Sequence, residues 1–286
     1  MKRSFALVCA VALTAGSAVA STGALAASAP VPSGSAAVSL DQAIAGNWRT
    51  DASRARDRYR HPQATLQFFG LRPEQTVIEI TPGGGWYSQI IAPVLEAHGH
   101  YIAAVIAPDS DKEAADDDSA LHKLFAADPA HYGNARIVTF DPKAPVLGPA
   151  AAADMVLTFR NAHNWTEAGT APAMFKAFFE VLKPGGVLGL VDHRTAPHTT
   201  YVAGKLGGYL PTDYVVKLAT DAGFQLAGKS EINANPKDDH HHPKGVWTLP
   251  PTMALGAKDA AKYRAIGESD RMTLRFVKPA TPAAAH

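Results

Sequence analysis

The chain of 286 residues contains a single cysteine, Cys9. It lies inside an apolar run near the amino terminus that has the features of a cleaved segment, so we expect the mature protein to have no cysteine. Such a chain suits an oxidising compartment, but it has no disulfide, no thiolate ligand for zinc and no cysteine nucleophile. Its stability must therefore come from an ordinary hydrophobic core.

The chain also lacks an excess of charge of one sign. It has 27 basic and 26 acidic residues, and the mature part has no dense run of lysine and arginine. Because non-specific nucleic-acid binding depends on a positive surface that neutralises phosphates, we expect no nucleic-acid partner. A small-molecule substrate suits this composition better, while the oligomeric state stays open.

No apolar run reaches the roughly 20 residues that a helix needs to span a bilayer. The run at residues 5–13 follows two basic residues and precedes two small-x-small cleavage sites. This pattern is typical of a secretory signal peptide. We predict a signal peptide over residues 1–26, cleaved after Ala20 or Ala26, and a flexible linker over residues 27–38. The mature protein would then be periplasmic or secreted, with no stable membrane insertion.

We expect residues 39–280 to form a single α/β domain with an amino-terminal helical cap at residues 39–70. Strands then alternate with helices, which predicts a mostly parallel sheet covered on both faces. The strands are expected at residues 76–81, 100–106, 135–140, 154–159, 186–192 and 224–231, and the helices at 86–97, 112–127, 170–182 and 212–222. The final segment RMTLRFVKP reads as a strand that could pair antiparallel with 224–231. Such a sheet would place a ligand crevice at the carboxyl ends of its first strands.

The segment from 76 to 93 reads as a buried strand, a turn with three adjacent glycines and the start of a helix. Glycines allow positive φ angles and close approach of the backbone to a ligand, while a helix start presents free N–H groups. A dinucleotide fingerprint requires G-x-G-x-x-G/A, but Ser88 stands where the last small residue belongs. The spacing therefore argues against a nicotinamide or flavin oxidoreductase.

Five segments between residues 70 and 232 occur in a characteristic order. They are Glu79 with the following glycines, FDP at 140–142, DMVLTFRNAHNW at 154–165, VLKPGGVLGLVDH at 181–193 and DAGFQL at 221–226. In this order they resemble the class I S-adenosylmethionine-dependent methyltransferases, and most closely the exported bacterial branch of predicted methyltransferases. The resemblance implies a Rossmann-like fold with a seven-stranded sheet whose last strand is antiparallel. It also implies methyltransferase activity with S-adenosyl-L-methionine as the cofactor.

The resemblance further implies which residues would bind the cofactor. They are Glu79, Thr81, Gly83, Gly84, Gly85, Trp86, Tyr87, Asp109, Asp141, Arg160 and Asn161. Glu79 could orient the amino-acid end, and either Asp109 or Asp111 could bind the ribose. Plain core packing explains Trp86 equally well, and a strand-end turn explains Asp141 equally well.

Polar residues after the fourth and fifth strands are the candidate catalytic residues. They are His163, Asn164, Asp192 and His193. His163 could be a general base, and Asp192 could orient His193 or a substrate hydroxyl. The alternative is that these side chains only hold the two strand ends together. The acceptor would be a small polar or aromatic molecule or an envelope component.

Two charged segments are open to more than one interpretation. DDHHH at 238–242 contains metal-binding residue types, but adjacent residues of an irregular segment seldom converge on one ion, so we expect an exposed loop and no metal site. Arg58 or Arg60 of the cap would lie on a solvated helix face, or would contact an anionic substrate. For the whole chain, the alternative to an enzyme is a non-catalytic small-molecule or nucleoside-binding protein on the same fold.

Overall fold

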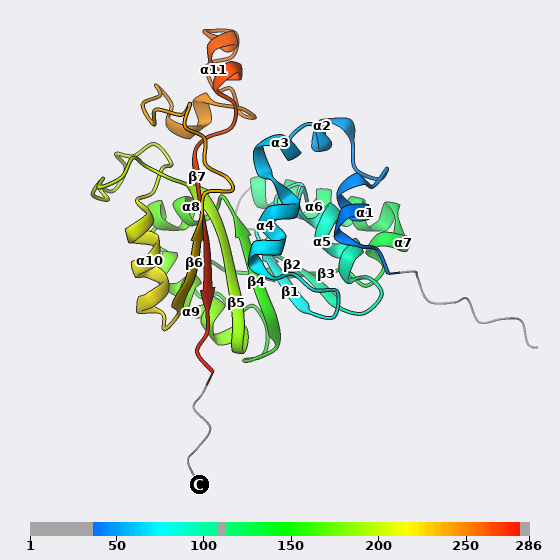
Figure 1. Cartoon of the computed structure of the whole chain (residues 1–286). Helices are drawn as coiled ribbons and strands as arrows, with labels where there is room; N and C mark the ends of the chain where they lie inside the picture. Colours follow the sequence, from blue (N-terminus) through cyan, green and yellow to red (C-terminus); the bar gives the residue numbers. More distant parts are fainter. Residues whose placement is uncertain (1–36, 108–111, 281–286) are drawn as a thin grey trace, which may run out of the picture. The chain divides into compact units, whose positions relative to one another are not determined.

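Figure 1 shows a computed structural model of the chain, which describes residues 37–107 and 112–280. The predicted signal peptide, most of the predicted linker and both ribose candidates, Asp109 and Asp111, lie outside the described residues. The described residues belong to one compact unit. Within them, no helix combines the length and the apolar composition needed to cross a membrane.

A seven-stranded sheet forms the centre of the fold, with the strand order β3-β2-β1-β4-β5-β7-β6. The strands are β1 (Thr76–Ile80), β2 (His100–Ile106), β3 (Arg136–Phe140), β4 (Ala153–Phe159), β5 (Leu182–His193), β6 (Gln225–Ser230) and β7 (Arg271–Val277). β7 is the one strand that runs opposite to the other six, and it pairs antiparallel with both β5 and β6. The predicted fold class is confirmed. The last strand pairs with β6 as expected, and it also pairs with β5 because it inserts between the two.

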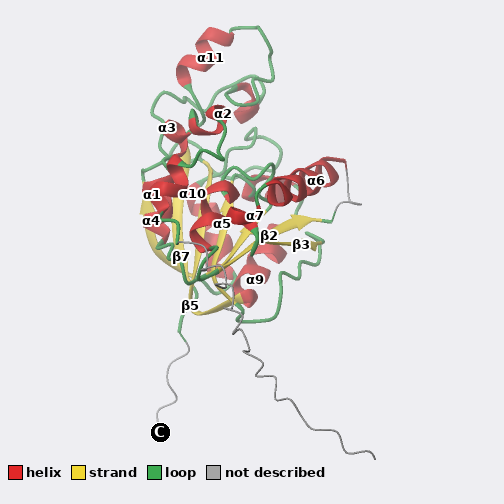
Figure 2. Cartoon of the chain, turned by 90° about the vertical axis from the view of Figure 1, so that its right-hand side faces the viewer, coloured by secondary structure: helices red, strands yellow, loops and turns green. Residues whose placement is uncertain are grey.

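Helices cover both faces of the sheet (Figure 1). On one side lie α1 (Leu40–Ala45), α4 (Pro62–Phe69), α5 (Ser88–Leu95), α6 (Lys112–Ala127) and α7 (Pro129–Tyr132), and on the other α8 (Ala162–Glu167), α9 (Ala171–Val181) and α10 (Thr212–Asp221). Figure 2 shows α6 beside the edge formed by β2 and β3. Successive side chains of a strand point to opposite faces of the sheet and so enter two hydrophobic cores. In β4, Met155 and Leu157 belong to one core and Val156 belongs to the other.

The amino-terminal cap is a series of short helices, because polar and proline residues interrupt it. It contains α1, α2 (Asp51–Arg54), α3 (Asp57–Arg60) and α4. Two aromatic residues after the glycine turn attach this cap to the domain. The Trp86 indole N–H donates to the carbonyl of Ser53 at 3.0 Å, and the Tyr87 hydroxyl donates to the carbonyl of Arg60 at 3.2 Å. The cap therefore lies directly over the glycine turn.

The carboxyl-terminal part beyond β6 contains few regular elements. A 3₁₀ turn, η1 (Gly245–Thr248), and α11 (Ala260–Ile266) precede β7. Because β7 pairs antiparallel with β5, the residues that lead into it are carried to the carboxyl ends of β4 and β5. This connection places a distant part of the sequence beside the crevice.

Candidate functional site

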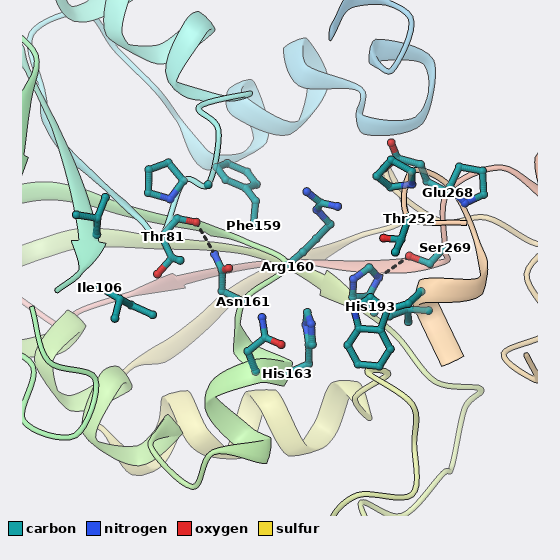
Figure 3. Close-up of a pocket in the computed structure, with 18 residues that line it drawn as sticks. Thr81, Ile106, Phe159, Arg160, Asn161, His163, His193, Thr252, Glu268 and Ser269 are labelled. Atoms are coloured by element: carbon teal, nitrogen blue, oxygen red, sulfur yellow. Dashed lines mark hydrogen bonds between the residues drawn. The ribbon is translucent and has the colours of Figure 1, made fainter. Parts of the chain in front are cut away.

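The carboxyl ends of three adjacent strands lie at the same level. Ile80 of β1 pairs with Ala104 of β2 and with Thr158 of β4. The chain therefore leaves these strands at one edge of the sheet, where a cavity of about 570 Å³ opens (Figure 3). It is lined by Thr81, Pro82, Gly83, Val105, Ile106, Phe159, Arg160, Asn161, His163, Asn164, His193, Val246, Trp247, Pro250, Pro251, Thr252, Glu268 and Ser269.

Two residues at this edge have a left-handed backbone. Thr81, just after β1, has φ of 48°, and Arg160, just after β4, has φ of 65°. Such angles are unfavourable for residues other than glycine and often mark functional sites. Asn161 holds the two strand ends together, because its side-chain amide donates to the carbonyls of Ile80 at 3.0 Å and of Thr81 at 3.2 Å.

A second cavity, of about 290 Å³, lies over the glycine turn and beneath the cap. It shares five lining residues with the larger cavity, namely Thr81, Pro82, Gly83, Phe159 and Arg160. Its other lining residues are Ser53, Arg56, Arg60, Glu79, Gly84, Trp86, Tyr87 and Gln89. The two cavities therefore adjoin at the ends of β1 and β4.

The glycine turn leaves its backbone open to the smaller cavity. Gly83 and Gly85 have positive φ angles of 57° and 79°. A Cβ atom on Gly85 would lie 2.8 Å from the Cδ2 atom of Leu124, whereas a Cβ atom on Gly84 would meet nothing within 4 Å. Gly85 is thus required by conformation and packing, while Gly84 leaves space that a ligand can use.

Glu79 is a buried carboxyl group at the wall of the smaller cavity. It accepts hydrogen bonds from the hydroxyls of Tyr101 at 2.6 Å and Ser88 at 3.0 Å. Burial raises the pKa of Glu79 to about 7, although these two hydrogen bonds and the positive charge of Arg60 act in the opposite direction. Hydrogen bonds therefore hold this carboxyl group in a fixed position, and its pKa lies close to neutral pH.

Two arginines of the cap that line the smaller cavity each have a buried nitrogen without a partner. The Nε atoms of Arg56 and Arg60 lie 2.7 Å and 3.5 Å from the Glu268 carboxylate. Among the described residues, however, nothing accepts a hydrogen bond from the buried Nη2 atom of either arginine, and the buried hydroxyl of Thr81 has no partner. Because buried polar groups are normally satisfied, three such groups around one cavity indicate a site for an anionic or strongly accepting ligand.

In the larger cavity, His163 and Asp192 form a buried pair. His163 Nδ1 lies 2.9 Å from Asp192 Oδ1, and the backbone N–H of His163 donates to Oδ2 at 3.1 Å. This leaves His163 Nε2 as the ring nitrogen available to a ligand. The carboxylate also accepts from the backbone N–H of His193 at 2.7 Å. Asp192 therefore positions both histidines.

His193 is the second histidine of this group. Its ring centroid lies 5.0 Å from that of His163, and its Nδ1 atom shares a hydrogen bond with the hydroxyl of Ser269 (Figure 3). Burial, together with the electrostatic effect of the neighbouring His163 and Arg160 side chains, lowers the pKa of His193 well below its usual value. His193 is therefore neutral at neutral pH.

The structure brings most of the predicted site residues to the two cavities. Those that line a cavity are Glu79, Thr81, Gly83, Gly84, Trp86, Tyr87, Arg160, Asn161, His163, Asn164 and His193. Asp192 and Gly85 lie just behind them. Asp141 lines none of the cavities described here, because it lies in an exposed turn after β3 and accepts a hydrogen bond from the backbone N–H of Lys143 at 2.8 Å.

Several lining residues were not anticipated. Arg56 belongs to the cap, and Trp247, Glu268 and Ser269 come from the segment between β6 and β7. No local motif marks them, since the insertion of β7 between β5 and β6 is what carries the last two to the cavity. The RNAHNW motif, by contrast, is marked by its position directly after a strand.

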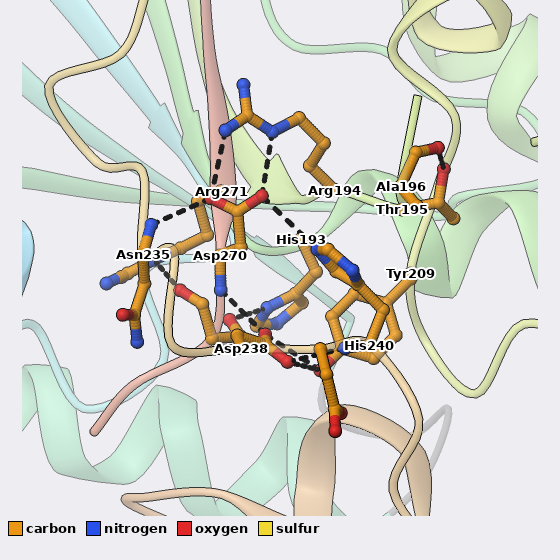
Figure 4. A network of polar contacts seen from close by, with 12 residues as sticks. His193, Arg194, Thr195, Ala196, Tyr209, Asn235, Asp238, His240, Asp270 and Arg271 are labelled. Carbon is orange, nitrogen blue, oxygen red and sulfur yellow. Dashed lines mark hydrogen bonds and ion pairs between the residues drawn. The ribbon is translucent and has the colours of Figure 1, made fainter. Parts of the chain in front are cut away.

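The DDHHH segment differs from the expected exposed loop. Asp239 and His241 are exposed, but Asp238 is buried and accepts hydrogen bonds from the Tyr209 hydroxyl and the backbone N–H of Asp270 (Figure 4). Asp238, Asp239 and His242 offer potential ligand atoms within 4.8 Å of one another, as do His163, Asp192 and His193. The residues after Asp238 form one wall of a third cavity, of about 820 Å³. This third cavity shares Trp247 with the 570 Å³ cavity that contains His163.

No protein-family model and no curated protein matches the chain, but solved structures do. A SAM-dependent methyltransferase from Aquifex aeolicus is 14% identical over 78% of this chain and 93% of its own, with a TM-score of 0.53. The cyclase SpnF is 15% identical over 85% and 93%, with a TM-score of 0.56. CrArsM, an arsenic (III) S-adenosylmethionine methyltransferase from Chlamydomonas reinhardtii, is 13% identical over 86% and 75%, with a TM-score of 0.50. The chain therefore has the Rossmann-like fold of class I SAM-dependent methyltransferases, a fold on which function is decided by the site.

Proposed function

We propose that this protein is an exported S-adenosyl-L-methionine-dependent methyltransferase that acts on a small molecule or an envelope component. The observation that carries the proposal is the pair of adjoining cavities at the glycine turn. The smaller has unpartnered guanidinium nitrogens, and the larger has a His163–Asp192 pair. One cavity suits the amino-acid end of the cofactor, and the other suits its nucleoside together with the acceptor.

The residues present fit the chemistry of this cofactor. Its α-carboxylate would bind the free Nη2 atoms of Arg56 and Arg60, because a buried guanidinium nitrogen requires an acceptor. Its α-amino group would lie near the fixed carboxyl of Glu79, and the open backbone at Gly84 gives it space. Val105 and Ile106, at the end of β2, supply an apolar wall for a nucleoside base in the larger cavity.

When bound, the cofactor would supply an electrophilic methyl group on a sulfonium sulfur; the acceptor's lone pair would bond to the methyl carbon, and the sulfur would leave as a neutral thioether. For an acceptor with a hydroxyl or amine, His163 Nε2 takes the departing proton, since Nδ1 is engaged by Asp192. The Asp192 carboxylate stabilises the imidazolium that forms. Neutral His193 contributes a hydrogen bond to the acceptor without adding a charge.

Binding of the demethylated cofactor tests this proposal. Calorimetry with S-adenosylhomocysteine should show saturable one-to-one binding to the protein that begins at residue 37. Gly84→Asp should abolish this binding, because a carboxylate placed beside Arg56 and Arg60 competes with that of the ligand. Gly84→Ala is the matched control, since its Cβ lies in open space, and should retain most of the binding.

Each outcome of this experiment discriminates between functions. If the folded wild-type protein binds neither S-adenosylhomocysteine nor S-adenosylmethionine, the methyltransferase proposal fails. If it binds them but transfers no labelled methyl group to any component of a cell-envelope extract, a nucleoside-binding protein is the better description. Equal binding by Gly84→Asp would place the ligand away from the glycine turn.

Export is supported by the amino-terminal sequence, whose basic start, short apolar run and small-x-small sites are those of a signal peptide. Amino-terminal sequencing of the protein recovered from the periplasm or the medium should begin at Ser21 or Ala27. Recovery of the intact chain from the cytoplasm alone would contradict export without affecting the proposed activity.

A further inference from the structure

Among the arginines that line the two adjoining cavities, Arg160 is the one whose guanidinium group has no bonding partner in the described part of the chain. Its guanidinium group makes no hydrogen bond, ion pair or cation–π contact with any described residue. The arginines around it differ, because Arg56, Arg60 and Arg271 all contact the carboxylate of Glu268. Figure 3 shows the Arg160 side chain extending into the cavity between Phe159 and His193. An unpaired charge in such a place is costly unless a ligand completes it.

The nearby carboxylates are already occupied. Glu268 is held by three arginines, and these charges lower its pKa to about 2 although burial alone would raise it. Both oxygens of Asp192 accept from His163, and one also accepts from the backbone of His193. Neither carboxylate is free to turn toward Arg160. The junction of the two cavities is therefore electropositive.

The backbone at Arg160 is consistent with a functional role. Its positive φ of 65° costs about 1 kcal/mol or more for a residue with a side chain. Burial and the charges of Arg271 and Arg56 lower the pKa of Arg160 to about 10, although the charges of Glu268 and Asp192 act in the opposite direction, and Arg160 stays protonated at neutral pH. The strained backbone and the desolvated charge of Arg160 both lower the stability of the ligand-free protein. We expect the binding of a ligand to Arg160 to offset these two costs.

The electropositive junction disfavours the metal ion that the nearby histidines suggest. His163, Asp192 and His193 offer ligand atoms within 4.8 Å of one another, but the oxygens of Asp192 already accept hydrogen bonds. The charge of Arg160 disfavours a divalent cation here as it disfavours protonation of His193. The same charge favours an anion.

We propose that the Arg160 guanidinium group binds a carboxylate of the methyl acceptor. The inference rests on the proposed function, because it assigns the larger cavity to the acceptor. Arg56 and Arg60 line only the smaller cavity and have their own free nitrogens for the cofactor, whereas Arg160 lines both cavities. One part of the remaining wall is apolar and is formed by Val246, Trp247 and Pro251. The acceptor is accordingly a small molecule with an apolar part and one carboxylate.

Benzoate and benzamide are suitable probes, because they have the same shape and differ in charge. Ligand-observed NMR on the protein saturated with S-adenosylhomocysteine should show benzoate binding about tenfold more tightly than benzamide, as expected for a charge-assisted hydrogen bond. In Arg160→Gln this preference should fall to about twofold or less, whereas Arg160→Lys, which keeps the charge, should retain a clear preference. Arg264→Gln, the same change at an exposed position of α11, should leave the preference unchanged.

Two further measurements separate binding from folding. The melting temperature of ligand-free Arg160→Gln should equal or exceed that of the wild type, because the substitution removes an unpaired desolvated charge. A clear loss of stability would show that Arg160 has a structural role and would overturn the inference. The affinity of Arg160→Gln for S-adenosylhomocysteine should stay within about threefold of the wild-type value.

The remaining outcomes distinguish this inference from the proposed function. Equal binding of benzoate and benzamide by the wild type overturns the inference, even when S-adenosylhomocysteine binds. Failure of S-adenosylhomocysteine to bind overturns the proposed function, and the same probe titration without it still shows whether the cavity selects anions. Loss of S-adenosylhomocysteine binding in Arg160→Gln, with an unchanged benzoate preference, would assign Arg160 to the carboxylate of the cofactor.

Discussion

Glu79 is the clearest case in which one residue makes the stability of this protein depend on pH. Its pKa is raised from 4.5 to about 7, so the folded protein binds this proton more tightly than the unfolded chain does. The cost of ionising Glu79 is thus absent below pH 4.5, grows as the pH rises and is complete above pH 7. At 1.36 kcal/mol per pKa unit it reaches about 3 kcal/mol.

A Glu79→Gln variant should reveal this cost, since the amide stays neutral and its oxygen can still accept from Tyr101 and Ser88. We expect the free energy of unfolding of the variant, relative to the wild type, to increase by up to about 3 kcal/mol between about pH 4.5 and about pH 8. Urea denaturation of the ligand-free proteins at both pH values measures it. A difference that does not change with pH would mean that folding does not raise the pKa of Glu79.

Glu268 should have the opposite effect on stability, because it neutralises three arginines, of which Arg60 and Arg271 are buried. Glu268→Gln leaves Arg56, Arg60 and Arg271 without their shared carboxylate, and we expect a loss of about 3–5 kcal/mol in the free energy of unfolding. The control is Glu231→Gln, whose exposed pair with Arg194 should contribute about 1 kcal/mol or less. Similar losses in the two variants, measured by chemical denaturation, would contradict the buried role of Glu268.

At the scale of elements, two neighbouring glycines of the turn have different roles. Gly85 is needed for the fold, and Gly84 leaves space for a ligand. Gly85→Ala combines a positive φ with a contact of 2.8 Å to Leu124, and we expect it to destabilise the protein by about 2 kcal/mol. Gly84→Ala has neither problem and should change the free energy of unfolding by about 0.5 kcal/mol or less. Thermal unfolding of the two variants provides the comparison. A larger loss for Gly84→Ala would show that the turn is not as open as described.

The elements of this chain were largely predictable from the sequence, since each strand has a local apolar pattern and each helix follows a turn or proline. The strand over His100–Ile106 and the helix over Lys112–Ala127 have the predicted bounds. The RNAHNW cluster was also predictable, because residues after parallel strands meet at one edge. The sequence pattern did not predict α8, a short helix formed by residues 162–167. It also did not predict that the cap is divided into short helices.

The parts of the site that could not be predicted depend on contacts between distant segments. Glu268 meets Arg56 across more than two hundred residues, and Ser269 meets His193 across 76. No periodicity or spacing encodes such a meeting, because it follows from the packing of β7 and the cap around the sheet. The missing partner of Arg160 is likewise visible only when every neighbour has been placed.

At the scale of the whole molecule, the strand order makes the last strand essential. β7 bridges β5 and β6, with Leu274 paired to Leu190 on one side and to Lys229 on the other. A chain that ends at Asp270 should therefore fail to fold cooperatively, as judged by the loss of a sigmoidal denaturation curve. A chain that begins at residue 37 and keeps β7 is the matched control and should unfold cooperatively. Cooperative unfolding of the chain that ends at Asp270 would show that β7 is dispensable.

The position of β7 between β5 and β6 also sets the order in which the fold can form. Because residues 271–277 follow both strands in the chain, a nascent chain emerges with β5 and β6 unjoined and without Glu268 to neutralise the cap arginines. The sheet therefore stays incomplete until β7 has been made. The export proposed above would benefit from this order, because a chain that crosses a translocation pore must be unfolded.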